Sequence, residues 1–544
     1  MRLINADTLK LEEFVNQDLT PPYAILSHTW EDDEVTFQDW RDEEARAKKR
    51  GFRKIELTCR QAIRDGYSHV WVDTNCIDKR SSAELSESIN SMFAWYRNAA
   101  VCYVYMADVP TSSRAEDPRA PDSHFRRSRW FTRGWTLQEL IAPLDVEFYT
   151  KDWVLLGTKE NLVQAINEAT GVDEACLRGD SLPTEFGIAE TMSWASARIT
   201  TRPEDQAYCL LGLFGVNMPL LYGEGSKAFL RLQEEIIKIS DDQSIFAWGM
   251  QSLVITSPLA TSPAVFSGSR GIRRWYRIAV FMENLPPFYS MTNAGLSITL
   301  PLIQTLSPRL VLGVLNCYTM GKEASLHVCI PLSSHATHYR HQYIRVALPA
   351  PWVSVCVNAT RLPRTSIMIS VPSTETYTYS SSQIFGPVRR MDAKVFFFIT
   401  FPYSLSKYRL SAAYPPEALE KRTSLMAMIS HTRSDNMGCG LLVFEENGSG
   451  YGSGKYVGIY LEAALRHEGA AEDWPRACRV IPNWDIGDSL DTINEANEDL
   501  PLGRSSWAVD VSVSVRTVVP IQSGHAPNIS TLLLAEIVFG IDHN

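Results

Sequence analysis

The sequence predicts an α/β domain with an open, mainly parallel sheet, followed by a helical extension and a β-rich domain. Between Tyr23 and Trp153, short apolar runs alternate with amphipathic stretches, which is the pattern of βα units. The following residues, to about 240, show mainly helical periodicity. After Trp248, β-branched runs broken by Pro, Ser and Gly indicate antiparallel strands of a sandwich or barrel. We therefore expect domains at residues 1–160, 161–248 and 249–544.

The composition narrows the class of protein. The chain has 544 residues, more than one hydrophobic core usually supports, and 45% of them are hydrophobic, as in globular proteins. A formal net charge of −10 argues against a broad surface for nucleic acid or anionic membrane. The cysteines are scattered singly, and the sequence shows neither a secretory signal nor an apolar run long enough to span a bilayer. These features predict a cytoplasmic protein without a membrane span.

The elements of the α/β domain follow from periodicity. Apolar side chains of two helical stretches recur at helical spacing, the first set at Ile55, Cys59, Ala62 and Ile63 and the second at Ile89, Met92, Trp95 and Ala99. Short apolar runs around them predict four strands, at residues 23–28, 69–75, 101–109 and 145–150. Residues 110–121 are polar and rich in proline, which predicts a surface loop.

The later elements are predicted in the same way. A stripe of Phe229, Leu232, Ile236 and Ile239 predicts a helix that docks on the first domain. Six β-branched or aromatic runs then predict strands, at residues 310–318, 324–332, 343–349, 352–358, 365–372 and 394–401.

Polar stretches follow two of the predicted parallel strands. SHTWEDDE, residues 27–34, closes the first strand, and DTNCIDK, residues 73–79, closes the second. A third stretch, SRWFTRGWTLQEL at 128–140, places Glu139 among tryptophans and aliphatic side chains. Carboxylates are rarely buried unless they are paired, hydrogen-bonded or chemically useful. Because ligands of such sheets bind beyond the carboxyl ends of the strands, the three stretches are predicted to converge on one pocket.

Each of these side chains also has a purely structural explanation. Asp32, Asp73 and Asp78 are suited to cap helices, and Trp30 to fill a gap in the core. Taken singly, the structural role is the simpler one.

Three further patterns suggest other chemistries. GSGYGSGK, residues 448–455, has the wrong spacing for a phosphate-binding loop and is followed by a strand-like run, so a glycine-rich hairpin is favoured. Cys59, His69 and Cys76 lack a second close ligand pair for zinc, and Cys59 lies on the apolar face of a predicted helix, so buried structural cysteines are favoured. A Ser27 or Cys76 nucleophile assisted by His28 or His69 stays open, although no nucleophile elbow is present.

Five blocks in order resemble the fungal heterokaryon-incompatibility (HET) domain: YAILSHTW, GFRKIELTCRQA, VWVDTNCIDK, SINSMFAWYRNAAVCYVY and SRWFTRGWTLQELIAP, between Tyr23 and Pro143. The segment from MSWASARITTRPEDQ to FLRLQEEII resembles the region that commonly trails that domain. Together they cover about the first 240 residues. The resemblance implies a cytoplasmic effector of programmed cell death in fungal nonself recognition, the process called vegetative incompatibility.

HET domains are in turn distantly similar to the TIR domains of immunity proteins. That likeness implies a TIR-like (flavodoxin-like) sheet, with YAILSH as its first strand and VCYVY as its central strand. It also places Glu139, in the run W-T-L-Q-E-L, on the catalytic position of TIR enzymes that cleave NAD. Gly134 beside Trp135 departs from the usual small-residue run. NAD would be a substrate here, and no cofactor or metal is implied.

The chemistry of NAD suits a single carboxylate. Oxidised nicotinamide is already cationic, so it leaves without a strong general acid, and a carboxylate can stabilise the oxocarbenium-like charge on the ribose. Trp130 or Trp135 could stack on a ring, and one of four arginines, at 126, 127, 129 and 133, could meet the diphosphate, although core packing and a solvated basic face explain the same residues. The candidate substrate-binding residues around the catalytic Glu139 are Ser27, His28, Trp30, Asp73, Cys76, Arg129, Arg133 and Trp135.

Two functions of different classes remain. In the first, the protein is an NAD glycohydrolase of TIR-like type. In the second, it is a non-catalytic signalling module that assembles through protein–protein interaction. In either case its expected partners are other incompatibility or receptor proteins, or further copies of itself, because the sequence carries no recognisable nucleotide-binding oligomerisation module.

Overall fold

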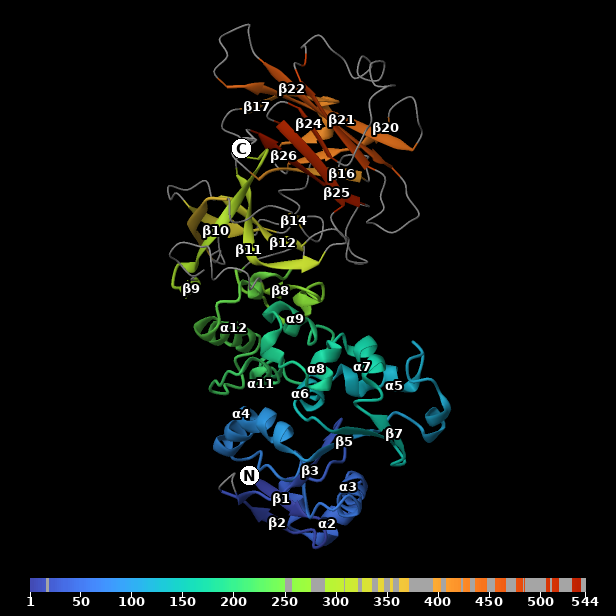
Figure 1. Cartoon of the computed structure of the whole chain (residues 1–544). Helices are drawn as coiled ribbons and strands as arrows, with labels where there is room; N and C mark the ends of the chain where they lie inside the picture. The colour runs from blue at the N-terminus through green and yellow to red at the C-terminus, as the bar shows by residue number, and fades with distance from the viewer. Residues whose placement is uncertain are drawn as a thin grey trace. The chain divides into compact units, whose positions relative to one another are not determined.

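Figure 1 shows the computed structural model of the chain, in which two compact units are distinguished. The first comprises Met1–Ser240 and Thr261–Arg270, and the second comprises Asp241–Ala260 and Gly271–Asn544. The division into three domains stays a prediction. The structure describes residues 1–15, 19–249, 257–274, 289–307, 309–320, 325–334, 341–346, 353–355, 362–370, 395–402, 408–421, 424–430, 436–447, 455–465, 476–482, 484, 505–508, 511–517 and 531–539.

The first unit is built on a seven-stranded mixed sheet. Its strands in spatial order are β2 (Leu11–Glu13), β1 (Arg2–Asn5), β4 (His69–Trp71), β3 (Tyr23–His28), β5 (Val101–Met106), β6 (Val146–Thr150) and β7 (Leu155–Thr158). The four predicted strands, β3 to β6, are confirmed and pair in parallel. Strands β1, β2 and β7 were not predicted, and each pairs antiparallel. The expectation of a parallel sheet therefore holds only for the four central strands. The three outer strands were not predicted because their three or four residues are too few to show an alternating pattern.

The order of the parallel strands locates a crevice. Numbered along the chain, they lie in the order 2-1-3-4, so the connection reverses direction between β3 and β5. Ligands of doubly wound sheets bind at such a reversal, outside the carboxyl ends of the strands. Here that point is the end of β3, at Ser27 and His28.

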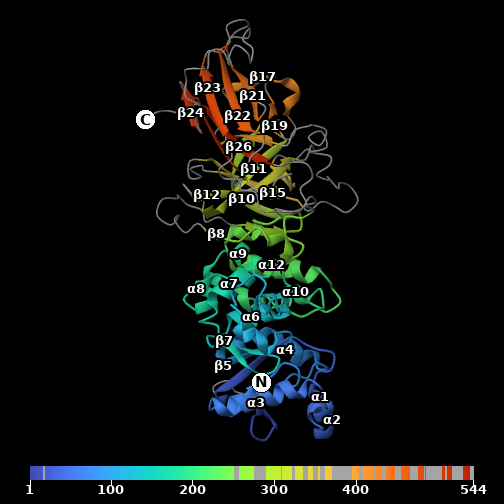
Figure 2. The ribbon, with the colours of Figure 1, turned by 90° about the vertical axis from the view of Figure 1, so that its right-hand side faces the viewer.

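Helices cover both faces of this sheet (Figures 1 and 2). Helix α3 (Phe52–Arg64) lies on one face, and α4 (Ser82–Asn98) with α6 (Thr136–Ile141) lies on the other. The predicted stripe of α3 is buried except for Ile63, which is 44% exposed because it lies at the edge of the face. The remaining helices of this part are α1 (Phe37–Trp40), α2 (Glu43–Lys48) and α5 (His124–Arg127), with a 3-10 turn, η3, at Arg129–Thr132.

The extension folds as short helices within the first unit. They are α7 (Val163–Thr170), α8 (Glu174–Arg178), α9 (Ile188–Ser193), α10 (Asp205–Tyr208), α11 (Leu211–Phe214) and α12 (Lys227–Ile239). Helix α12 buries Phe229, Leu232 and Ile236 as predicted, whereas Ile239, in its last turn, is 65% exposed. Helix α11 packs tightly on α4, since a Cβ on Gly212 would lie 2.1 Å from Cβ of Phe93. Only glycine permits that approach, which holds the extension against the α/β part.

The second unit is β-rich, as predicted. Its larger sheet has a path β24-β25-β26-β16-β10-β15-β13-β12-β11-β8, and its smaller sheet has the path β17-β21-β22-β23. The six predicted runs are confirmed as β11 (Leu310–Met320), β12 (Ser325–Ser334), β13 (Gln342–Arg345), β14 (Val353–Val355), β15 (Arg364–Ile369) and β16 (Val395–Phe401). Pairing is antiparallel except between β13 and β15 and between β16 and β26. The other bounds are β8 (Arg273–Arg274), β9 (Tyr289–Thr292), β10 (Gly295–Thr305), β17 (Tyr408–Tyr414), β18 (Leu419–Glu420), β19 (Leu425–Ala427), β20 (Ile429–Ser430), β21 (Met437–Glu446), β22 (Tyr456–Ala464), β23 (Arg476–Pro482), β24 (Ser505–Ala508), β25 (Val511–Thr517) and β26 (Thr531–Phe539).

One apolar cluster joins the two sheets of this unit. Phe397 and Phe401 of the larger sheet and Leu442 and Ile459 of the smaller sheet belong to it, so the sheets pack face to face there. The glycine-rich stretch at 448–454 lies outside the described residues. The strands beside it, β21 and β22, pair antiparallel, and the run after it is the predicted strand.

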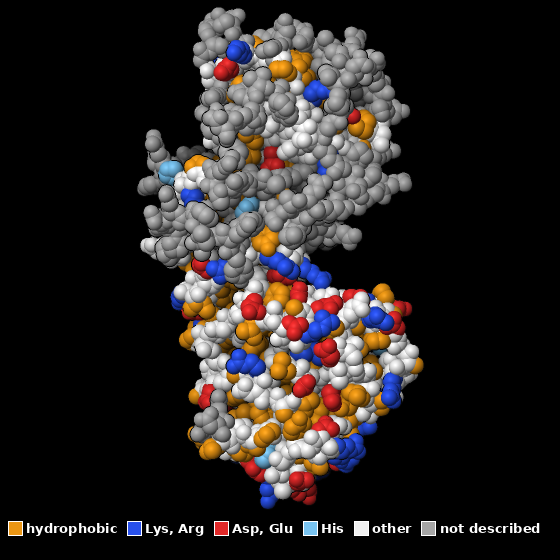
Figure 3. Space-filling model, viewed as in Figure 1, with side chains coloured by type: hydrophobic (Ala, Val, Ile, Leu, Met, Phe, Trp, Pro, Cys, Tyr) orange, Lys and Arg blue, Asp and Glu red, His pale blue; other side chains and the backbone are white. Residues whose placement is uncertain are grey.

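Two observations concern the predictions about nucleic acid and membranes. On the face of the first unit shown in Figure 3, basic and acidic side chains are interspersed and no broad basic area is visible. No helix in the described part of the chain has both the length and the apolar character needed to cross a membrane.

Candidate functional site

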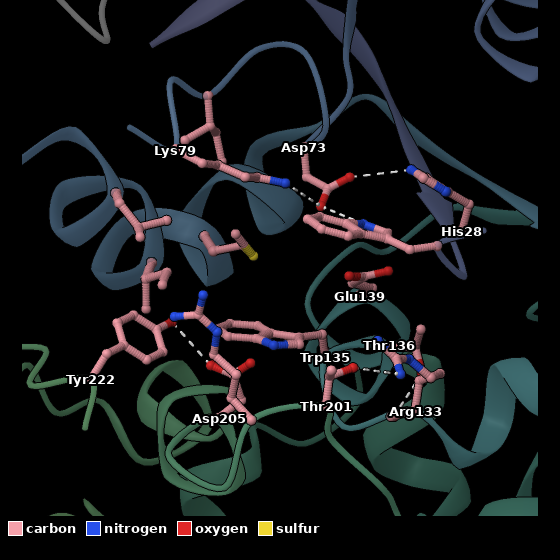
Figure 4. Close-up of a pocket in the computed structure, with 16 residues that line it drawn as sticks. His28, Asp73, Lys79, Arg133, Trp135, Thr136, Glu139, Thr201, Asp205 and Tyr222 are labelled. Atoms are coloured by element: carbon pink, nitrogen blue, oxygen red, sulfur yellow. Dashed lines mark hydrogen bonds and ion pairs between the residues drawn. The ribbon is translucent and has the colours of Figure 1, made fainter. Parts of the chain in front are cut away.

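A cavity of about 290 Å³ opens in the first unit, beyond the carboxyl ends of β3 and β4. Figure 4 shows His28, Asp73 and Lys79 on one side of it, Thr201, Asp205 and Tyr222 on the other, and Glu139 between them. The lining residues are His28, Trp30, Asp73, Ile77, Lys79, Leu85, Ile89, Met92, Arg133, Trp135, Thr136, Glu139, Thr201, Arg202, Asp205 and Tyr222. The cavity thus has one wall from the strand ends and one from the extension.

Glu139 is held by a short chain of hydrogen bonds. The hydroxyl of Ser27, at the end of β3, donates to Oε2 of Glu139 at 2.5 Å. The same hydroxyl accepts a hydrogen bond from Nε1 of Trp130 at 2.8 Å. Trp130 is fully buried, edge-on to Phe148 with ring centroids 5.7 Å apart. Because the indole can only donate, the serine proton is directed at the carboxyl group, which fixes its orientation.

The surroundings of Glu139 favour its protonated form. Glu139 is only 7% exposed, and this burial raises its pKa from 4.5 to about 8. The hydrogen bond from Ser27 and the charge of Arg133 lower the pKa, whereas the charge of Asp73 raises it. Glu139 is therefore mainly neutral at pH 7 in the protein alone, and a nearby positive charge would favour its ionisation.

Asp73 is the centre of a polar cluster on the strand wall. Its Oδ1 lies 3.2 Å from Nε2 of His28, and its Oδ2 accepts a hydrogen bond from Nε1 of Trp30 at 2.9 Å. The ammonium of Lys79 is 3.6 Å from Oδ2 and 3.5 Å from the centre of the Trp30 ring. Burial raises the pKa of Asp73, but Lys79, His28 and Trp30 together lower it by more than burial raises it. The net shift of this pKa is therefore downward. Asp73 is therefore a carboxylate beside a neutral Glu139.

The wall from the extension carries aromatic and cationic side chains. The guanidinium of Arg133 donates to Oγ1 of Thr201 at 3.3 Å. The hydroxyl of Tyr222 donates to Oδ1 of Asp205 at 3.0 Å, and Cζ of Arg202 lies 4.5 Å from the centre of the Tyr222 ring. Burial raises the pKa of Asp205, and hydrogen bonds from Tyr222 and Trp135 oppose that shift.

Gly134 explains how the two walls are joined. Its amide donates to the carbonyl oxygen of Ile199 at 3.0 Å, and a Cβ at this position would lie 2.4 Å from Cγ2 of Thr200. A side chain is therefore excluded where the extension crosses the start of α6. The departure from the TIR pattern at this glycine corresponds to a close approach of backbone segments.

The predicted site residues are distributed between the cavity and its surroundings. Ser27 lies behind Glu139, outside the lining. Cys76 is buried, accepts a hydrogen bond from the amide of Val72 at 3.4 Å, and has its pKa raised to about 12 by burial. Arg129 pairs with Glu31 at 3.4 Å and does not line the cavity. The predicted residues that line it are His28, Trp30, Asp73, Arg133, Trp135 and Glu139, and their roles stay predictions.

Other residues that line the cavity were not predicted from the sequence. Thr201, Arg202, Asp205 and Tyr222 belong to the extension, about sixty to eighty residues after Glu139 in the chain. No local pattern marks them as site residues, and the only available signal was the cluster of charged residues in TTRPEDQ.

His69 and Cys59, two of the residues considered for zinc, have other surroundings in the structure. His69 contacts Oε2 of Glu12 through Nε2 at 3.1 Å, and Cys59 is buried on α3. Within the residues that the structure describes, no group of three His, Cys, Asp or Glu side chains could hold a metal ion.

Comparison with known proteins agrees with the sequence blocks. The family model described as heterokaryon incompatibility protein (HET) matches residues 23–122, and a domain of unknown function (DUF8212) matches residues 227–258. The vegetative incompatibility protein HET-E-1 of Podospora anserina is 50% identical over 222 residues. That match covers 40% of this chain and 16% of the relative, so the chain corresponds to a small part of that protein. No solved structure matches significantly. The N-terminal region of the chain, with residues 23–122 at its centre, is therefore similar to the heterokaryon incompatibility (HET) domain.

Proposed function

We propose that this protein is a cytoplasmic effector of fungal vegetative incompatibility that causes cell death by cleaving NAD or a related nucleotide. The biological role is supported by the HET region and by the similar protein, which is named a vegetative incompatibility protein. The chemical part rests on one observation, a buried and hydrogen-bonded carboxyl group, Glu139, that lines a cavity at the strand ends.

The position of the cavity supports a TIR-like reading of the fold. The parallel strands begin the order 2-1-3-4-5 of flavodoxin-like sheets, and the cavity lies next to the reversal between β3 and β5. The segment with Glu139 follows the central strand, as the resemblance to TIR domains implies. We propose this likeness as the fold of the first unit.

The reaction would break the bond between the ribose and the nicotinamide nitrogen. The electron pair of that bond leaves with the nitrogen, which neutralises the cationic ring and leaves positive charge on the ribose. Ionised Glu139 stabilises this charge, and a water molecule then attacks the ribose carbon and loses a proton to solvent. Ser27 keeps one carboxylate oxygen in place, because it is itself oriented by Trp130.

The raised pKa of Glu139 is compatible with this role. In the protein alone the group is mainly protonated, because its pKa is about 8. The cationic ring of NAD would favour the carboxylate by the same electrostatics through which Arg133 lowers that pKa. Substrate binding is then coupled to release of a proton, and the negative charge is present when the ribose becomes positive.

The test is nicotinamide release by the purified full chain. The protein is concentrated and mixed with NAD, and free nicotinamide is measured by chromatography for the wild type and for Glu139→Gln. We expect release by the wild type and a decrease of at least about a hundredfold in the variant, because glutamine keeps the volume but loses the charge. Equal release by both proteins, with the variant folded, would remove Glu139 from catalysis.

One observation favours the second function. The bonds among Glu139, Ser27 and Trp130 connect α6 with β3, so the carboxyl group also has a structural role. If the chain releases no nicotinamide but associates with itself or with another incompatibility or receptor protein on concentration, it acts as a non-catalytic signalling module. Sedimentation of the same samples measures this.

A further inference from the structure

Two arginines at the cavity, Arg133 and Arg202, form no ion pair with any residue that the structure describes. Other cations nearby are paired, Lys79 with Asp73 at 3.6 Å and Arg129 with Glu31 at 3.4 Å. In contrast, Arg133 contacts a hydroxyl group, that of Thr201, and Arg202 contacts an aromatic ring, that of Tyr222. Within the described part of the chain neither guanidinium forms an ion pair. Both line the cavity, so their charges are available to a ligand.

Arg202 is held in place although it is exposed. Its guanidinium lies 4.5 Å from the centre of the Tyr222 ring, which is within the range of a cation–π interaction. The hydroxyl of Tyr222 is in turn bonded to Asp205, at the start of α10. A stacked guanidinium keeps its donors free at the edge of its plane, where they suit the two oxygens of a phosphate.

We propose that Arg133 and Arg202 form an anion subsite that binds the diphosphate of the nucleotide in the Glu139 cavity. The region after the HET match would then supply a specificity-determining residue of the site. The identity of the ligand as a dinucleotide rests on the proposed function, whereas binding of a diphosphate can be measured without any reaction.

The charges around the cavity fit a ligand of this kind. Asp73 and Glu139 lie on the side where a cationic ring would be stabilised, and the two unpaired arginines belong to the stretch around α6 and to the extension. Lys79 is 3.6 Å from Asp73, and Asp205 accepts hydrogen bonds from Tyr222 and Trp135 and has its pKa lowered by the charge of Arg202. Neither Arg133 nor Arg202 is within ion-pair distance of a described carboxylate, so a diphosphate can approach both without displacing one.

The experiment compares two ligands in a background without turnover. The full chain carrying Glu139→Gln is titrated by calorimetry with ADP-ribose, which has the diphosphate, and with nicotinamide riboside, which has no phosphate. The same titrations are made with a second substitution added to this background: Arg202→Gln, Arg202→Lys or Arg64→Gln. Arg64 is an exposed arginine in the last turn of α3 that does not line the cavity, so its variant removes the same charge elsewhere.

We expect Arg202→Gln to weaken ADP-ribose binding about tenfold or more, because a charge-assisted contact is lost. Binding of nicotinamide riboside should change less than about twofold, and Arg64→Gln should leave both affinities unchanged. Arg202→Lys should give an intermediate loss, since it keeps the charge and loses the planar fork. Addition of salt should weaken ADP-ribose binding less in Arg202→Gln than in the parent.

The outcomes separate this inference from the proposed reaction. Absence of ADP-ribose binding to the parent, an unchanged affinity in Arg202→Gln, or an equal loss for both ligands would overturn the anion subsite. Arg202-dependent ADP-ribose binding without nicotinamide release from NAD by the Glu139-containing chain would support the subsite and remove the reaction. Nicotinamide release with the same KM for NAD in Arg202→Gln would support the reaction and remove the subsite.

Discussion

Glu139→Gln should change the dependence of stability on pH as well as the activity. The pKa of Glu139 is raised from 4.5 to about 8 in the folded protein, chiefly by burial. The folded state therefore holds this proton more tightly than the unfolded state. As the pH rises from about 4.5 to about 8, the wild type loses stability, and above that window the loss is constant. Glutamine does not titrate, so the variant does not show this pH-dependent loss of stability.

The size of the effect follows from the two pKa values. At pH 6 the folded carboxyl is protonated while the unfolded one is ionised, which lowers the free energy of unfolding by about 2 kcal/mol. At pH 9 the reduction is about 5 kcal/mol, so the wild type should lose about 3 kcal/mol relative to the variant over this interval. All other titrating groups are common to the two proteins and cancel in the comparison.

The assay is thermal unfolding of both full-length proteins at several pH values between 6 and 9. Because the chain has two compact units, the transition that responds to the mutation is followed, and its midpoint is compared between the proteins. We expect the midpoint of Glu139→Gln to rise relative to the wild type with increasing pH. A difference that does not depend on pH between 6 and 9 would show that Glu139 is ionised throughout this range and would refute this description of its surroundings.

Three further substitutions test parts of the site. Ser27→Ala should lower the free energy of unfolding by about 1–3 kcal/mol in urea titrations, because Trp130 and Glu139 lose a buried partner, and an unchanged value would contradict the bond chain. Asp73→Asn should move the pH midpoint of the Glu139 effect below about 8, since the charge of Asp73 raises that pKa, and an unmoved midpoint would show that the two groups are not coupled. Gly134→Ala should destabilise the protein by about 1–3 kcal/mol, because the new Cβ would lie 2.4 Å from Thr200, and a neutral effect in the same titrations would mean that the extension can move away.

The sequence predicted the parts of the fold that have a long or uninterrupted apolar pattern. Strand β3 is buried at every residue and was predicted with the bounds it has, and α3 was predicted from its apolar stripe. Strands β1, β2 and β7 have at most four residues, too few to distinguish alternation from chance. Ile63 and Ile239 were assigned to buried stripes and are exposed, because periodicity locates the centre of an apolar face better than its edge.

The candidate site was predictable only as far as chain topology determines it. Residues at the ends of parallel strands meet at one edge of the sheet, so the gathering of His28, Asp73 and Glu139 could be expected. The wall formed by Arg202, Asp205 and Tyr222 depends on how the extension crosses α6 at Gly134, which is a tertiary contact without a local signal.

The contacts of Glu139 account for a carboxyl group among the tryptophans of residues 128–140. Pairing with a cation does not explain the buried carboxyl group, since Glu139 forms no ion pair within the described residues. Hydrogen bonding does, because Ser27, oriented by Trp130, donates to Glu139. Hydrogen bonding alone leaves a cost, because a pKa of about 8 means that burial disfavours ionisation by more than Ser27 and Arg133 offset. A glutamine could serve as the same structural link without that cost. A ligand with a positive charge would favour ionisation of Glu139 and would give the titratable group an advantage over glutamine, and the proposed cleavage of a cationic nucleotide would supply such a ligand.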